Sequence, residues 1–217
     1  MNKEKKSLLF AILAAGSLWG LSEVLLGGFL HSHAPHILKA GILTGVGLGI
    51  IGIFIAMFER PLYALGIGLV AVMTKQLVVP ILGVSVMCKA NACLAVMLSA
   101  GAVAAAVSIF SRKKPALIGA AAGFSSSAVF YFAGMMLAPC PYLLSFNHRL
   151  MSWLFTEGIL WAAFPALLFP LGLMAGEKLK SGAFAVLNSK PAVYYGFASA
   201  ITVCSLVISA VAIYMGA

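Results

Sequence analysis

The chain has 217 residues, of which 63% are hydrophobic and only 9% are charged. A soluble domain usually carries about 25% charged residues, so this composition excludes an ordinary soluble domain; its hydrophobicity also excludes a disordered chain. The 14 Lys and Arg residues outnumber the five acidic residues, all of which are Glu. Basic residues placed between long apolar runs are typical of membrane topology. We therefore expect an integral membrane protein in a lipid bilayer, with no nucleic-acid partner.

Several runs are long and apolar enough to cross a bilayer, which takes about 20 residues in a helix. They are Ser7–Leu30, Ala40–Phe58, Pro61–Gly83, Ala90–Phe110, Pro115–Ala138, Leu150–Gly176 and Pro191–Gly216. The runs are apolar on every side, whereas strands of a membrane barrel alternate apolar and polar residues. The sequence therefore predicts an all-α fold, a polytopic transmembrane helix bundle of six to seven spans, forming one domain over residues 1–217.

The first run follows a basic segment, as the apolar core of a signal peptide does. It is longer than the 7–15 residues usual for such a core, and no clean cleavage site follows it. We therefore interpret it as the first membrane span. The second and third runs are joined only by Glu59 and Arg60, which predicts a tight antiparallel hairpin.

The basic residues predict the orientation, because they are enriched on the cytoplasmic side of membrane proteins. With a cytoplasmic N-terminus, the outer side carries Lys39, Lys89 and Arg149. The cytoplasmic side then carries Lys3, Lys5, Lys6, Arg60, Arg112, Lys113, Lys114, Lys178, Lys180 and Lys190. This bias predicts a multi-pass protein of the plasma or inner membrane with its N-terminus in the cytoplasm.

Three ionisable residues fall inside the predicted spans: Glu23, Lys75 and Glu157. Charges at membrane depth are costly, usually face the interior of the bundle, and mark functional sites. Counting along each helix places all three roughly 10–12 Å below its outer end. A structural Lys–Glu pair would account for two of these charges. The other carboxylate would then need a proton, a hydrogen-bond network or a ligand.

Each of the three tryptophans lies four residues from one of these acids. Trp19 precedes Glu23, and Trp153 and Trp161 flank Glu157. Residues four apart share a helix face, and an acid beside indole rings suits a flat organic ligand, either neutral or cationic. The alternative is that the tryptophans anchor the protein at the membrane interface.

A glutamine and two prolines lie near the buried charges and tryptophans in the sequence. Gln76, beside Lys75, adds a hydrogen-bond donor and an acceptor to the candidate substrate-binding set. Pro165 and Pro170 are expected to bend the sixth span and to free backbone carbonyls where the helix breaks.

The predicted outer side also carries the histidines and most of the cysteines. His31, His33 and His36 could bind a transition metal through imidazole, as in a nickel or cobalt permease component; alternatively they are solvated loop residues. Cys88 and Cys93 could form a disulfide on that side. With no Asp and no H-E-x-x-H sequence, we expect no catalytic residues, no enzyme activity and no cofactor.

Small residues recur four apart in several spans, which permits close helix packing in lipid. The pairs and triplets are Ala11 and Ala15, Gly16 and Gly20, Gly41, Gly45 and Gly49, Gly119 and Gly123, and Gly172 and Gly176. They serve either packing within the bundle or docking of another membrane subunit. Ala11 and Ala15 are the candidates for partner docking.

Taken together, spans one to six resemble the substrate-binding S component of energy-coupling factor (ECF) vitamin transporters. Ala11-x-x-x-Ala15 is similar to the family motif that contacts the coupling subunit, and the polar candidates gather in the outer half of the bundle. S components usually have six spans, whereas this chain has a seventh. The resemblance implies capture of a vitamin or similar small organic ligand, with transport driven by a coupling membrane subunit and ATPases. A membrane assembly protein without a ligand is the further alternative.

Overall fold

The computed structural model describes residues 3–110, 114–137, 139, 141–146 and 149–216. Within these ranges every regular element is a helix, and seven helical segments are long and apolar enough to cross a membrane. The elements are α1 (Lys3–His33), α2 (His36–Phe58), η1 (Pro61–Tyr63), α3 (Ala64–Lys75), α4 (Val78–Leu82), η2 (Val86–Lys89), α5 (Ala90–Ile109), α6 (Pro115–Leu137), α7 (Pro141–Leu144), α8 (Leu150–Trp153), η3 (Leu154–Gly158), α9 (Ile159–Ser189) and α10 (Pro191–Tyr214). The predicted all-α, multi-pass membrane bundle is confirmed.

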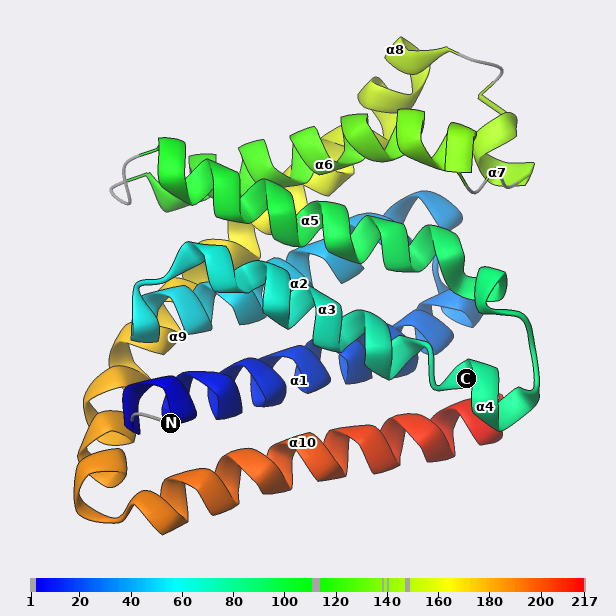
Figure 1. Ribbon diagram of the computed structural model, residues 1–217. Coiled ribbons are helices and arrows are strands. Elements are labelled where there is room, and N and C mark those ends of the chain that lie inside the picture. Colours follow the sequence, from blue (N-terminus) through cyan, green and yellow to red (C-terminus); the bar gives the residue numbers. More distant parts are fainter. Residues whose placement is uncertain (1–2, 111–113, 138, 140, 147–148, 217) are drawn as a thin grey trace.

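Six of the long helices form a closed ring. In order around the ring, α1 packs on α3, α3 on α5, α5 on α6, α6 on α9, α9 on α2, and α2 on α1. The seventh, α10, lies outside the ring along α1 (Figure 1). Its small buried residues Ala198, Ser205 and Ser209 fall on one helix face. The seventh predicted span is therefore a helix, but an addition to a six-helix ring.

The two ends of the bundle group the connections as the predicted topology does. Figure 1 places the N-terminus and the connection between α9 and α10 at one end, and the C-terminus with α7 at the other. Glu59 and Arg60 join α2 to η1, and Glu59 adopts a left-handed conformation (φ 57°). The predicted tight hairpin was wrong in its packing, because α2 packs mainly on α9 and α1, and α3 mainly on α1 and α5. At this end Arg60 pairs with Glu4 at 2.7 Å and Lys180 with Glu59 at 2.6 Å.

The third predicted span is interrupted. Helix α3 ends at Lys75, a turn follows at residues 76–77, and α4 then runs from Val78 to Leu82. Irregular backbone at membrane depth is tolerated where protein surrounds it rather than lipid. The interruption places the Lys75 side chain at the C-terminal end of a helix, where the helix dipole favours a cation.

The sixth span differs from the prediction in two ways. Helix α9 continues through Pro165 and Pro170 and past Gly176 to Ser189, so the expected proline break was wrong. The irregularity lies earlier, in the π-helical turn η3 that contains Glu157. A proline removes one helical hydrogen bond, and neighbouring helices can compensate for that loss. At about 1.5 Å per residue, the 31-residue α9 is longer than the ~30 Å apolar core of a bilayer.

Most of the small-residue pairs pack inside the ring. Glycines of α2 and of α6 face the backbone of α9: a Cβ on Gly123 would lie 1.7 Å from the Trp161 carbonyl oxygen. Pro165 cannot donate to that carbonyl, because it lacks an N–H. Gly172 of α9 approaches the Gly49 carbonyl oxygen of α2 equally closely, with a built Cβ only 2.0 Å away. These contacts fix α9 between α2 and α6.

We predict that Gly123→Ala lowers the thermal unfolding temperature of the purified protein in mild detergent. The added methyl group would overlap the Trp161 carbonyl oxygen, and overpacking of this kind costs about 1–3 kcal/mol. A loss of several degrees in Tm is expected from scanning fluorimetry. Gly182→Ala is the matched control, because nothing lies within 4 Å of a Cβ built there. Equal Tm values for the two variants would contradict the close contact between α6 and α9.

Candidate functional site

A cavity of about 320 Å³ lies inside the ring, in the half predicted to face outward. All six ring helices contribute to it, together with α7, α8 and η3, whereas α10 does not. The lining residues are Trp19, Glu23, Lys39, Ala40, Leu43, Thr44, Lys75, Asn91, Ala92, Ala95, Val96, Ser99, Phe130, Tyr142, Leu143, Trp153, Glu157 and Trp161. Six of the seven predicted substrate-binding residues therefore share one cavity. Its size suits a small organic molecule.

One side of the cavity is formed by an ion pair. The Glu23 carboxylate lies 2.6 Å from the Lys75 ammonium, and their side chains are only 6% and 11% exposed. The Trp19 indole N–H also donates to Glu23, at 3.3 Å. The structure thus pairs Lys75 with Glu23, which the sequence left open, and this pair carries no net charge.

Glycines bring these groups together. A Cβ on Gly20 would lie 2.4 Å from Thr74 Cβ, so α1 and α3 approach closely just below the ion pair. Gly47 of α2 makes room for the Trp19 ring, since a Cβ there would lie 2.2 Å from its indole nitrogen. These small residues allow the Trp19 ring to be 99% buried, rather than anchored at the membrane surface.

Gln76 is the predicted residue that does not reach the cavity. Its amide nitrogen donates to the Val86 carbonyl at 3.3 Å and lies 3.2 Å from the Cys93 sulfur. The turn after α3 directs it toward the start of α5, and there it supports the break in the third span.

Cys93 is a free, buried thiol, so the predicted disulfide with Cys88 is not formed; the Cys88 side chain lies outside what the structure describes.

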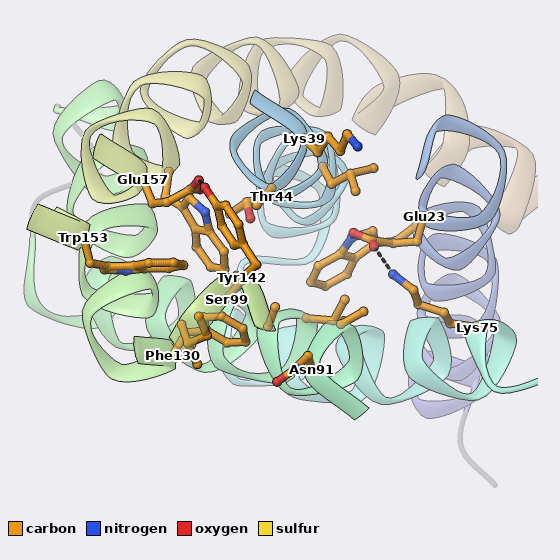
Figure 2. Close-up of a pocket in the computed structure, with 18 residues that line it drawn as sticks. Glu23, Lys39, Thr44, Lys75, Asn91, Ser99, Phe130, Tyr142, Trp153 and Glu157 are labelled. Atoms are coloured by element: carbon orange, nitrogen blue, oxygen red, sulfur yellow. Dashed lines mark hydrogen bonds and ion pairs between the residues drawn. The ribbon is translucent and has the colours of Figure 1, made fainter. Parts of the chain in front are cut away.

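Glu157 forms the opposite side of the cavity, as Figure 2 shows. Its side chain is 1% exposed and accepts a hydrogen bond from the Tyr142 hydroxyl. Burial, and then the neighbouring Glu157, raise the pKa of Tyr142, so the phenol keeps its proton and donates. Within the described part of the chain Glu157 forms no ion pair. Glu157 lies in the π-helical turn η3, an irregularity frequent at functional sites.

Aromatic rings surround Glu157. Trp153 and Trp161 are each 2% exposed and pack on Phe130, with ring centroids 6.0 and 5.5 Å apart. The Trp153 indole N–H is held by Ser127, through a bond of 2.9 Å to its hydroxyl. The Trp161 indole N–H lies near the Glu157 carboxylate but meets no acceptor within hydrogen-bonding geometry. This buried donor is available to a ligand.

Sequence reasoning missed several polar residues of the cavity: Lys39, Thr44, Asn91, Ser99 and Tyr142 (Figure 2). Lys39 donates to the His31 carbonyl at 3.3 Å, and the Asn91 side-chain oxygen is buried without a partner. In the sequence Lys39 indicates only topology, and a single Thr, Asn or Ser within an apolar helix has no distinct signal. Tyr142 comes from the short helix α7, whose approach to η3 no local pattern indicates.

The histidine alternative gains no support from the described residues, among which no group of three metal-ligating side chains occurs. His31 and His33 are exposed at the end of α1. The His33 ring stacks on Phe29 at 4.5 Å, and its Nδ1 lies 3.0 Å from the Phe29 carbonyl oxygen. The side chain of His36 lies outside the described residues.

Comparison of the chain with protein-family models, with curated proteins and with solved structures finds no match.

We predict that Lys75→Met strongly destabilises the protein. Removing one member of a buried ion pair leaves an uncompensated charge and costs about 3–5 kcal/mol. The double variant Glu23→Gln/Lys75→Met removes both charges, and its Tm in detergent is expected to recover much of the loss. Arg60→Met, which breaks the exposed pair with Glu4, should change Tm little. A double variant no more stable than Lys75→Met would argue against a pairwise charge effect.

Proposed function

We propose that the protein is a non-catalytic, membrane-embedded solute-binding subunit of an uptake transporter. It would capture a vitamin-like small organic molecule from the extracytoplasmic side of the plasma or inner membrane. The observation that carries this proposal is the buried Glu157, which faces a cavity walled by aromatic rings and has no cationic partner among the described residues.

The charges of the cavity favour a particular kind of ligand. Glu23 is neutralised by Lys75, so Glu157 is left as the carboxylate able to meet a ligand's positive charge or hydrogen-bond donor. A flat ring beside it could stack on indole and phenyl faces, and cation–π attraction would add to this. The unpartnered Trp161 N–H and Asn91 oxygen offer one donor and one acceptor to polar edges of the same molecule.

The arrangement of the helices supports an S-component-like role. The cavity is built by a ring of six helices, the number of spans typical of that family, and α10 lies outside it. Docking of a coupling membrane subunit at Ala11 and Ala15, with ATPases behind it, stays a prediction. Both alanines are partly buried and line a second, apolar groove between α1 and α10.

We predict that Glu157→Gln weakens ligand binding at least tenfold, or about 1.4 kcal/mol. The amide keeps the shape of the side chain but removes the charge that faces the ligand. Native mass spectrometry from mild detergent would first identify a small molecule retained by the wild-type protein. Because all three tryptophans line the cavity, quenching of their fluorescence then measures its affinity.

Glu177→Gln is the matched control, since Glu177 is exposed on α9 beyond the cavity and should bind as the wild type does. Equal affinities for the two variants would remove Glu157 from the site. A wild-type protein that retains no small molecule, and whose fluorescence responds to none of a panel of flat cationic and neutral heterocycles, would contradict the binding function itself.

A further inference from the structure

A second hollow lies in the opposite half of the bundle. It measures about 630 Å³ and is almost entirely apolar. Four stretches line it: Ala11–Leu18 of α1, Ile50–Phe58 of α2, Lys178–Val186 of α9 and Val193–Ile201 of α10. We call it the cytoplasmic groove, because these stretches belong to the helix halves that the basic residues assign to the cytoplasmic side.

The dimensions of this groove match one leaflet of a bilayer. The stretches of α1, α2 and α10 are eight or nine residues long, which corresponds to about 12 Å along a helix. One leaflet contributes about 15 Å to the hydrocarbon core. A transmembrane helix with its side chains is about 10 Å across. An acyl chain is narrower and is apolar along its whole length, as the groove is.

The charge at the cytoplasmic end indicates the headgroup. Lys178 lines the groove and forms no ion pair within the described part of the chain. Further lysines lie around this end: Lys3 donates to Asn188 at 3.4 Å, and the Lys6 ammonium lies 4.7 Å from the centre of the Tyr195 ring. Basic residues between helices on the cytoplasmic side are typical sites for anionic lipid headgroups.

We propose that the cytoplasmic groove binds an acyl chain of an anionic phospholipid from the cytoplasmic leaflet, with its phosphate at Lys178. This inference does not depend on the solute-binding proposal. The bound lipid would fill the gap between α2 and α10 and hold the outer helix against the ring. It would also cover Ala11 and Ala15, so a coupling subunit could dock there only after the lipid leaves.

The test reconstitutes the full chain in nanodiscs of equal parts phosphatidylcholine and phosphatidylglycerol, and counts retained lipids by native mass spectrometry. At least one retained lipid is expected, with phosphatidylglycerol enriched severalfold. Gly182→Leu should reduce retention at least fivefold, because Gly182 lines the groove and a side chain there meets open space. Gly196→Leu, in equally open space on α10, should retain lipid as the wild type does, because Gly196 is not among the α10 residues that line the groove.

A second variant tests the headgroup. Lys178→Gln should abolish the enrichment of phosphatidylglycerol, whereas Lys114→Gln, an exposed cytoplasmic lysine outside the groove, should preserve it. Far-UV circular dichroism equal to that of the wild type would show that Gly182→Leu is folded. The proposal is overturned if the two leucine variants retain the same lipid, if the two lipids are retained equally by the wild type, or if the protein emerges without lipid as a monomer or a dimer.

Discussion

The Glu23 carboxylate and the Lys75 ammonium lie 2.6 Å apart inside the bundle, and much of the structure follows from this contact. A lone charge at membrane depth is costly, so each of these groups requires the other. The pair ties α1 to α3 at the point where the third span is interrupted. It also neutralises one of the two buried carboxylates, and this leaves Glu157, on the opposite side of the cavity, without an ion-pair partner among the described residues.

Small residues make that arrangement possible. Helices in lipid gain little from the hydrophobic effect, so their association depends on close packing. Gly20 lets α1 approach α3, Gly123 lets α6 approach the backbone of α9, and Gly172 does the same for α9 and α2. These contacts close the ring around the cavity. Because α10 joins the bundle outside the ring, it leaves the cavity unchanged and creates the cytoplasmic groove beside α1.

The buried charges and the tryptophans of the candidate site could be predicted from the sequence, because such residues are rare inside apolar runs and therefore stand out. Gln76 shows the limit of that reasoning: it lies next to Lys75 in sequence, but the turn after α3 directs it toward Val86 and Cys93. Tyr142 shows the opposite case, since it lies on a short helix and reaches Glu157 only through the packing of α7 near η3. No local sequence pattern indicates either the direction of the Gln76 side chain or the contact between Tyr142 and Glu157.

The sequence by itself determined the all-α membrane class, the approximate positions of the spans and which of them carry the buried charges. These are properties of single segments, which the thickness of the bilayer imposes on each helix separately. Only the tertiary structure decided that Lys75 pairs with Glu23 rather than with Glu157, that six helices close a ring, and that the seventh lies outside it. Such choices depend on the rotation and register of one helix against another, and these are set by contacts between residues far apart in the chain.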